Sequence, residues 1–432
     1  MAHLMENKIA VFWFRRDLRL EDNVALHNAL KTGGKIFPVF IFDENILDNL
    51  PKNDARVSFI YQTLHQLDTE LKKVGSSLLI KKGNPIKIWK SLITEHNITA
   101  VYTNKDYEPY ATKRDQEVEA FLMSKNVSFF SYKDQVIFEQ DELVKNDGLP
   151  YTVYTPYKNK WLQKFDVEVD TKEFVVEFSN FYNFTADFPT LKSIGFEESL
   201  IKVKSYNLSS LSNYDEIRDF PFQDKTSYLS PYFRFGLVSV RKMVLLALKT
   251  NATFLSELIW REFFMQVLFH FPKVVTNNFK QKYDAIPWRN NEKEFKKWCK
   301  GETGYPMVDA GMRQLNKTGY MHNRVRMITA GFLCKHLLID WRWGEAYFAE
   351  KLLDYELSAN NGNWQWAAGT GCDAAPYFRV FNPESQLKKF DKDLQYIRNW
   401  IEDYDELTYP PPIVEHKMAR ERAITTYKKA LN

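Results

Sequence analysis

The chain has 432 residues, 44% of them hydrophobic and 16% aromatic, so it exceeds one typical domain and can fill more than one core. Its net charge of +4 is uneven: residues 201–432 hold 34 Lys and Arg against 26 Asp and Glu, or +8, and residues 1–200 hold 25 against 29, or −4. Secreted and membrane proteins are disfavoured, because the sequence has no signal pattern, no membrane-length apolar run and only three cysteines, which indicate a reduced, cytoplasmic setting. The basic half is the better candidate for binding a polyanion.

Residues 6–127 alternate between short apolar runs and longer amphipathic segments. Strands are predicted at 9–14, 36–42, 78–80 and 100–103, with helices at 24–30, 59–74 and 86–93. This βαβ series predicts an α/β domain, a doubly wound parallel sheet with helices on its faces. No GxGxxG motif follows the first strand, so a dinucleotide site of the familiar kind is not expected there. A ligand of this domain is expected at the carboxyl ends of the strands, near Arg15, Asp17 or Glu108.

The periodicity fades over residues 128–198, where Asn146-Asp147-Gly148 and Thr155-Pro156 are turn signals, so this stretch is predicted to be a connector. Residues 199–432 predict a larger all-α domain. Apolar residues there follow helical spacing in 238–248, 254–269, 295–298, 307–315, 325–338 and 343–353.

Hydroxyl side chains precede a proline in the segment TSYLSP, residues 226–231. Proline is favoured at the first helical position, which makes Ser230 the predicted N-cap of a helix. Hydroxyls and unpaired backbone N–H groups at a helix start suit a phosphate. Simple capping is the commoner use of such a motif and remains the alternative.

One stripe of a predicted helix carries Glu257, Trp260 and Arg261 at spacing i, i+3, i+4 among apolar neighbours. A carboxylate beside a bulky ring in apolar surroundings has a raised pKa and suits proton donation. The alternative is a structural ion pair between this Glu and this Arg.

A second predicted helix places Asn323, Arg326 and Met327 on one face. Arg326 is expected to pair with Asp354, and Asn323 to address the ring nitrogens or oxygens of a ligand. His322 is expected to be structural, and because no second histidine lies at ligand spacing, no metal site is predicted.

Residues 352–383, LLDYELSANNGNWQWAAGTGCDAAPYFRVFNP, combine carboxylates, amides and tryptophans in a way that ordinary core helices do not. Such a mixture suits a planar heteroaromatic ligand. On a helix, a two-residue offset places Trp364 and Trp366 about 200° apart, so the two rings are expected to face different surroundings.

Several segments together resemble the photolyase and cryptochrome family of blue-light flavoproteins, and most closely its class I cyclobutane pyrimidine dimer photolyases: FWFRRDLRLEDN, TSYLS, ELIWREFF, TGYPMVDAGMRQL, MHNRVRMITAGFL and ANNGNWQWAAGTGCDAAPYFRVFNP. The resemblance covers nearly the whole chain in register. It implies FAD as cofactor, UV-damaged DNA as partner and a monomeric lyase. In that family, reduced FAD excited by blue light, directly or through an antenna, gives an electron to a flipped dimer, which splits.

The resemblance also implies a set of cofactor-binding residues for the FAD phosphates and the flavin ring: Tyr214, Thr226, Ser227, Leu229, Ser230, Trp260, Asn323, Arg326, Asp354, Glu356 and Asn360. Asn360 matches the residue that faces flavin N5, where an amide can donate or accept a hydrogen bond. Glu356 stands where the family usually has Asp near flavin N3, a departure that puts this one contact in question.

For the dimer and its DNA the resemblance implies Glu257, Trp260, Arg261, Asn323, Arg324, Met327, Trp366 and Arg379. In that pocket the two tryptophans stack on the dimer, and the glutamate hydrogen-bonds a thymine carbonyl and stabilises the radical anion. An electron relay to oxidised FAD is implied for Trp364, Trp341 and Trp288. Glu108 resembles a folate-contacting antenna position, with deazaflavin or a second flavin left open.

Other functions remain as alternatives. A six-four photolyase would need histidines where Asn323 and Met327 stand. A cryptochrome, which senses blue light without repair, would usually carry a C-terminal extension. A flavoprotein electron carrier would have no use for the paired pocket tryptophans or for Arg379.

Overall fold

The computed structural model describes residues 8–431, so residues 6 and 7 of the predicted first domain lie outside the described range. The chain forms two compact units that interleave in sequence. The first unit contains residues 8–139, 164–204 and 229–249, and the second contains residues 140–163, 205–228 and 250–431. Each unit therefore collects three separate stretches of the chain.

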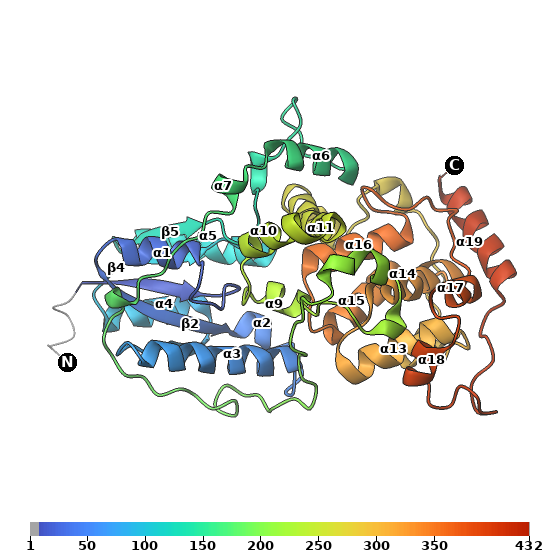
Figure 1. Ribbon diagram of the computed structural model, residues 1–432, viewed down its shortest axis with the longest axis horizontal. Helices are drawn as coiled ribbons and strands as arrows, with labels where there is room; N and C mark the ends of the chain where they lie inside the picture. Colours follow the sequence, from blue (N-terminus) through green and yellow to red (C-terminus); the bar gives the residue numbers. More distant parts are fainter. Residues whose placement is uncertain (1–7, 432) are drawn as a thin grey trace. The chain divides into compact units, whose positions relative to one another are not determined.

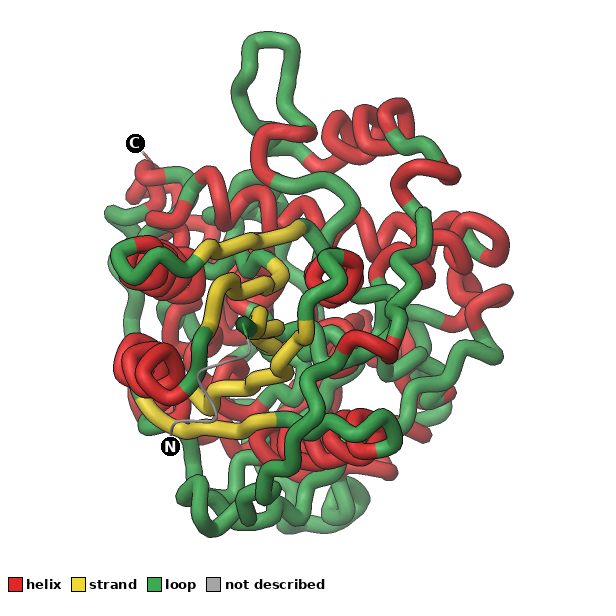
Figure 2. The backbone as a smooth tube through the Cα atoms, turned by 90° about the vertical axis from the view of Figure 1, so that its left-hand side faces the viewer, coloured by secondary structure: helices red, strands yellow, loops and turns green. Residues whose placement is uncertain are grey.

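Five parallel strands form the sheet of the first unit, in the order β3-β2-β1-β4-β5 (Figure 2). Their bounds are β1 Ile9–Phe14, β2 Lys35–Asp43, β3 Leu79–Gly83, β4 Ile98–Asn104 and β5 Ser128–Tyr132. The four predicted strands are present. The fifth, β5, lies at the start of the stretch expected to be a connector. It is an edge strand with mostly exposed side chains, so it lacks the continuous apolar run that marks the buried strands.

Helices cover both faces of this sheet (Figure 1). Helices α1 (Val24–Lys31) and α3 (Ala55–Lys72) pack with Phe12 and Phe14, while α4 (Pro85–Glu95) and α5 (Pro109–Met123) pack with Val11 and Trp13. Side chains alternate along a strand, so the unbroken apolar run of β1 fills two cores at once. The predicted doubly wound α/β fold is confirmed. The unit also holds α2 (Glu44–Leu47), α7 (Val167–Asp170), η3 (Phe178–Asn180), α9 (Ser230–Arg234) and α10 (Val240–Thr250).

The second unit is helical, as predicted. Its helices are α6 (Tyr154–Lys164), α8 (Tyr214–Ile217), α11 (Ala252–His270), α12 (Glu292–Lys300), α13 (Pro306–Thr318), α14 (Asn323–Gly331), α15 (Trp341–Lys351), α16 (Leu357–Ala368), α17 (Pro383–Phe390), α18 (Gln395–Trp400) and α19 (His416–Leu431). Short helical turns are η2 (Gln140–Glu142), η4 (Leu211–Asn213), η5 (Pro221–Gln223), η6 (Pro272–Val275), η7 (Gln281–Tyr283) and the π-helical η8 (Phe332–His336).

The helix expected over 325–338 needs a correction. Helix α14 ends at Gly331, and the wider turn η8 follows it directly. All five residues of η8 are buried, so the apolar spacing continues through the change of helix type and cannot reveal it.

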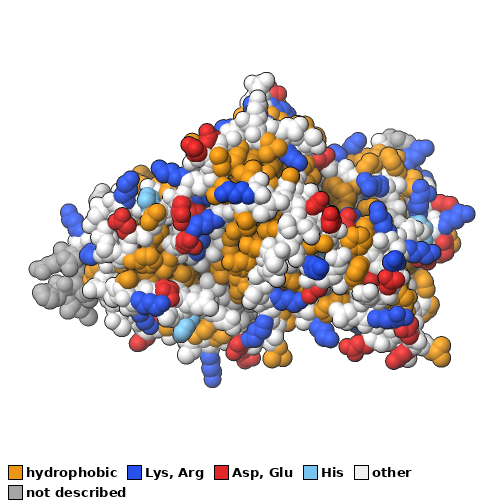
Figure 3. Space-filling model, in the orientation of Figure 1, with side chains coloured by type: hydrophobic (Ala, Val, Ile, Leu, Met, Phe, Trp, Pro, Cys, Tyr) orange, Lys and Arg blue, Asp and Glu red, His pale blue; other side chains and the backbone are white. Residues whose placement is uncertain are grey.

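A single large cluster of buried apolar side chains holds α12 to α16 together, and it contains Trp298, Trp341 and Trp364. None of the described helices is long and apolar enough to cross a bilayer. On the face drawn in Figure 3, Lys and Arg side chains are interspersed with Asp and Glu side chains. The positive excess of the second half is therefore not gathered into one patch on that face.

Candidate functional site

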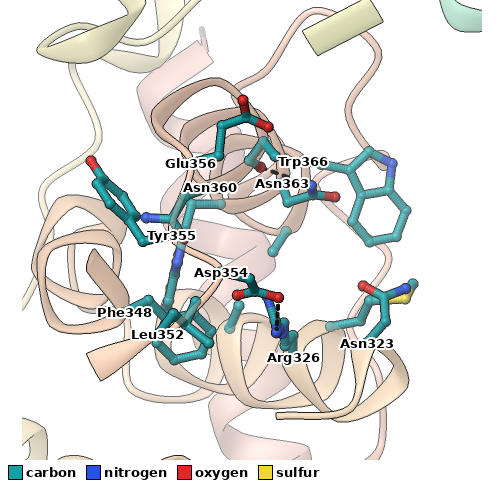
Figure 4. A pocket seen from close by; sticks show the side chains of 15 residues that line it. Asn323, Arg326, Phe348, Leu352, Asp354, Tyr355, Glu356, Asn360, Asn363 and Trp366 are labelled. Atoms are coloured by element: carbon teal, nitrogen blue, oxygen red, sulfur yellow. Dashed lines mark hydrogen bonds and ion pairs between the residues drawn. The ribbon is translucent and has the colours of Figure 1, made fainter. Parts of the chain in front are cut away.

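A pocket of about 590 Å³ opens between α14, α15 and α16. Its lining residues are Asn323, Arg326, Met327, Ala330, Phe348, Leu352, Asp354, Tyr355, Glu356, Ala359, Asn360, Asn363, Trp364, Trp366 and Ala367. Figure 4 shows the Arg326–Asp354 pair near its centre, with Phe348 and Leu352 to one side and Asn323 and Trp366 to the other. Its mixed lining of aromatic and polar side chains suits a ring-bearing ligand.

The predicted pair of Arg326 and Asp354 is present. Arg326 Nη2 donates to Asp354 Oδ2 at 2.9 Å, and its Nε donates to the Met321 carbonyl at 2.7 Å. The Asp354 side chain is 6% exposed, so the pair lies in a low-dielectric setting where charge-assisted hydrogen bonds are strong. Asp354 raises the pKa of Arg326 against the lowering effect of burial, so the guanidinium stays charged.

The amide of Asn360 is held by Glu345. Asn360 Nδ2 donates to Glu345 Oε1 at 2.8 Å and to the Glu345 carbonyl at 3.1 Å. Burial raises the pKa of the Glu345 carboxyl, and the hydrogen bond from Asn360 opposes that rise. The sequence analysis missed Glu345, because nothing in its α15 segment distinguishes it from a solvated helix residue.

Helix α16 carries Trp364 and Trp366 in different surroundings, as its geometry predicts. Trp364 is buried and packs edge-on against Phe348, with ring centroids 4.9 Å apart. Trp366 is partly exposed, and both rings border the pocket. Trp364 Nε1 is a buried donor without a partner among the residues that the structure describes.

A second, smaller cavity of about 180 Å³ lies between α11, α16 and the loop that follows α16. Trp260 and Phe264 form one side of it, and Trp366 and Gly362 form another. One face of Trp260 is already covered by Tyr154, whose ring is stacked on it at 3.6 Å. Phe264 lies near the same indole, with ring centroids 5.4 Å apart.

Glu257, Trp260 and Arg261 lie on α11 as predicted, but the possible ion pair between Glu257 and Arg261 does not form. Arg218 Nη1 pairs with Glu257 Oε1 instead, and Arg261 Nε lies 3.7 Å from Glu356 Oε2. These partners come from distant parts of the chain, which helical spacing cannot anticipate.

Arg324, at the start of α14, has a similar long-range partner. Its Nη2 donates to Asp219 Oδ1 at 2.6 Å, and its guanidinium lies 4.6 Å from the centroid of Phe390. Met327 lies one turn further along α14, where its sulfur is 3.7 Å from Arg324 Nη1. The side chain of Arg379 is exposed and lies over Phe381 at 5.6 Å.

Four of the predicted phosphate-binding residues lie close to the point in the sequence, between residues 228 and 229, where the second unit gives way to the first. Thr226 and Ser227 belong to the second unit, where Tyr320 donates its hydroxyl to Thr226 at 3.1 Å. Leu229 and Ser230 belong to the first unit. The prediction of Ser230 as N-cap is wrong: Leu229 holds that position and Ser230 begins α9, because Pro231 takes the second place in the helix.

Tyr214 belongs to the second unit, at the start of α8, where Arg218 lies 5.5 Å from its ring. Of the other predicted relay residues, Trp341 is buried and donates its Nε1 to Asn278 at 2.8 Å. Trp288 packs against the same apolar cluster as Trp341 and Trp364, and lies edge-on to Tyr427 at 5.9 Å.

In the first unit, Glu108 precedes α5 and pairs with Arg16 and Arg234, at 3.2 and 3.0 Å. Arg15 pairs with Asp115 at the end of β1, and buried Asp17 accepts a hydrogen bond from Asn104 at 2.7 Å. All of these residues lie where β1 and β4 end, at the point where the strand order reverses.

The residues of the larger pocket fit the flavin of FAD. An ion pair and an amide can hydrogen-bond a ring edge, the aromatic side chains provide flat walls, and the indole N–H of Trp364 is a donor at the wall. Asp354, Glu356 and Asn360 reach the pocket from the start of α16 and the loop before it.

Two family models match the chain: "DNA photolyase" over residues 10–175 and "FAD binding domain of DNA photolyase" over residues 254–408. The deoxyribodipyrimidine photo-lyase of Agrobacterium fabrum is 36% identical, over 96% of this chain and 97% of its own. A bacterial class III photolyase from Agrobacterium tumefaciens has a TM-score of 0.89 at 34% identity, over 100% and 99% of the two chains. The cryptochrome of Synechocystis has a TM-score of 0.86 at 25% identity, over 99% and 100%.

An α/β unit joined to a helical unit with an aromatic, ion-paired pocket defines a flavoprotein of the photolyase and cryptochrome type. The chain belongs to the DNA photolyase family and carries that family's FAD-binding domain. The predicted family, fold class, lyase class and FAD cofactor are confirmed. Assignment to class I remains a prediction, because one of the similar structures is a class III enzyme.

Proposed function

We propose that the protein uses light to repair cyclobutane pyrimidine dimers in UV-damaged DNA. FAD, bound in its reduced form and excited by blue light, supplies the electron that splits the dimer and takes it back. The observation that carries this proposal is the position of Trp366, which lines both the larger pocket and the cavity beside Trp260. Ligands in the two cavities would touch the same indole, which is the proximity that electron transfer between them requires.

In the larger pocket, the Arg326–Asp354 pair would hold the flavin edge, and the Asn360 amide would hydrogen-bond flavin N5. Glu345 fixes the orientation of that amide by accepting its hydrogen bonds. Glu356 would hydrogen-bond the N3 edge despite its extra methylene, and Trp260 and Asn323 would contact the cofactor from the dimer side. Phosphate binding is assigned to Tyr214, Thr226, Ser227, Leu229 and Ser230.

On the dimer side, Trp260 and Trp366 cover the apolar part of the flipped dimer. Asn323 and Met327, which line the larger pocket from α14, are also assigned to the dimer. Glu257 hydrogen-bonds a thymine carbonyl. Burial raises the pKa of the Glu257 carboxyl, and Arg218 opposes that rise. The DNA phosphates are met by three arginines, Arg261, Arg324 and Arg379.

Trp364, Trp341 and Trp288 carry an electron from the surface to FAD when the cofactor is oxidised. Trp364 and Trp341 are buried and Trp288 is partly exposed, so the proposed path would end near solvent.

We also propose that the protein is a monomer, that it works in the cytoplasm, and that it is most similar to the class I photolyases. We assign Glu108 to an antenna chromophore at the carboxyl ends of β1 and β4, with folate, deazaflavin and flavin as the candidates. Absorbance of the purified protein before and after release of its chromophores identifies which of them is present.

An illumination assay tests the function. Purified protein is chemically reduced and mixed with an oligonucleotide that carries one cyclobutane thymine dimer, and recovery of thymine absorbance is followed in light and in darkness. Recovery in light alone supports the proposal. If FAD and DNA both bind and no recovery occurs, a cryptochrome-type sensor is favoured, and repair of a six-four lesion by the same protein identifies the other subfamily.

A further inference from the structure

Four charged side chains of alternating sign lie in a row in the second unit: Glu257, Arg218, Asp219 and Arg324. Arg218 is paired with Glu257, Asp219 Oδ1 lies 3.9 Å from Arg218 Nε, and the same oxygen lies 2.6 Å from Arg324 Nη2. The outer two residues belong to α11 and α14, and the inner two follow α8. The proposed repair reaction uses the outer two and leaves Arg218 and Asp219 without a role.

The Arg324–Asp219 end of this row is partly open to solvent. The two side chains are 18% and 37% exposed, and Arg324 Nε is a buried donor that has no hydrogen-bond partner within the described part of the chain. Phe390 lies against the guanidinium and fixes its plane. A phosphate accepts two parallel hydrogen bonds from such a fork, and exposed ion pairs contribute little to stability, so a DNA phosphate can replace Asp219.

The Glu257 end responds to what happens at Arg218. Burial raises the pKa of the Glu257 carboxyl, Arg218 and the more distant Lys158 lower it, and Asp219 raises it. While Arg218 is paired with Glu257, the charged carboxylate is favoured. When Arg218 leaves, the neutral carboxyl is favoured, and only that form can donate a hydrogen bond to a thymine carbonyl.

We propose that Asp219 is a positioning residue that exchanges partners when DNA binds. A phosphate takes Arg324, the released Asp219 carboxylate turns fully to Arg218, and Arg218 then leaves Glu257 to the dimer. Glu257 takes up one proton from water in this exchange, and no other bond is made or broken. The inference rests on the proposed function, since the ligand is DNA that carries a pyrimidine dimer.

The substitution Asp219→Asn tests the first step, because it keeps the shape of the side chain and removes its charge. Glu216→Gln is the matched control, since it removes the same charge from an exposed position on α8. Because Arg324 is no longer neutralised, Asp219→Asn is expected to bind undamaged duplex DNA roughly 3–10-fold tighter than the wild type. Its DNA affinity is also expected to fall more steeply with salt concentration, by up to about one additional phosphate contact. Equal affinity and equal salt dependence in the two variants would overturn the proposal.

Infrared spectroscopy of protein labelled with ¹³C-glutamate tests the second step. The wild type is expected to gain a protonated carboxyl band when the dimer oligonucleotide binds, and loss of that band in Glu257→Gln assigns it. In Asp219→Asn no gain is expected, because Arg218 keeps Glu257 as its partner, and repair per absorbed photon falls although DNA binds more tightly. A normal gain of the band in Asp219→Asn contradicts the exchange.

Two controls separate this inference from the function on which it rests. Wild-type protein is assayed for repair in the same preparations. If it repairs the dimer and Asp219→Asn behaves like Glu216→Gln, the exchange alone is wrong, and if it does not repair, both proposals fail. Where Asp219→Asn does not fold with FAD bound, Asp219→Ser is measured in its place.

Discussion

The side-chain nitrogen of Asn360 donates to both a carboxylate oxygen and the backbone carbonyl of Glu345, at 2.8 and 3.1 Å. One residue of α15 therefore sets the orientation of the amide that faces the proposed flavin position. An amide has a donor end and an acceptor end, so fixing its nitrogen toward Glu345 turns its oxygen away from Glu345. The pair links the helix that carries Trp341 to the helix that carries Trp364.

We expect Glu345→Leu to lower the free energy of unfolding by about 1–3 kcal/mol, because the buried Asn360 amide loses its side-chain acceptor. Glu345→Gln retains an acceptor oxygen and is expected to cost less. Urea unfolding of both variants measures the difference, with bound FAD quantified by absorbance. Equal stability of Glu345→Leu and wild type would show that water replaces the lost acceptor.

The stability of the protein is expected to fall in acid partly because of His336, whose Nε2 lies 2.8 Å from His416 Nδ1. Burial, together with His416 and Arg422, lowers the pKa of His336 to about 3. The unfolded chain, with a His pKa of about 6.5, then binds more protons, so stability is lost as the pH falls from about 6.5 toward about 3. His336→Gln is expected to make the free energy of unfolding depend less on pH across that range.

Exposed His65 provides the control for this measurement. His65→Gln removes an exposed histidine, and its urea unfolding is measured over the same pH range as that of His336→Gln and the wild type. The same slope in His336→Gln and wild type would mean that His336 is already protonated in the folded protein.

The close approach of α11 and α16 requires Gly362. A Cβ atom at this position would lie 2.2 Å from the Phe264 ring, so Gly362→Ala is expected to destabilise the protein by about 1–3 kcal/mol and to narrow the cavity beside Trp260. Gly331→Ala, also in a helix, meets nothing closer than 3.7 Å and is the control. Thermal unfolding and affinity for the dimer oligonucleotide are compared for the two variants.

The ring stacked on Trp260 is expected to support dimer binding. Tyr154→Ala leaves Trp260 less constrained, and since an aromatic pair is worth about 0.5–1.5 kcal/mol, we expect a loss of affinity for dimer DNA of roughly 2- to 12-fold. Tyr154→Phe keeps the stacked ring and loses only the hydrogen bond to Ser256. If the two variants bind dimer DNA equally, the stacked ring has no part in binding.

Trp341→Phe is expected to abolish light-driven reduction of oxidised FAD while leaving repair by chemically reduced protein intact. Trp298→Phe is the control, because Trp298 is equally buried and lies 6.1 Å from Trp364 but is not assigned to the relay. Both reactions are followed by absorbance under blue light. Loss of photoreduction in Trp298→Phe and its survival in Trp341→Phe would reroute the electron through Trp298.

The sequence by itself determined those features that depend on neighbours a few residues apart. Alternation of apolar runs with amphipathic segments predicted the doubly wound sheet, and helical spacing put Glu257, Trp260 and Arg261 on one helix. The exposed edge strand β5 and the change to a π-helical turn at η8 escaped prediction, because apolar spacing carries no clear signal for either.

The Arg326–Asp354 pair was predicted from the sequence, but only the tertiary structure decided the partners of several other polar groups. Glu257 finds Arg218 rather than Arg261, Arg324 finds Asp219, and Asn360 finds Glu345. The first two pairs are separated in the chain by whole helices, and the third joins consecutive helices. A charged residue on an amphipathic helix has the same local pattern whether it faces water or a partner. Packing of α8, α11, α14, α15 and α16 selects among those possibilities, since a half-buried charge is stable only where the fold supplies its counter-charge.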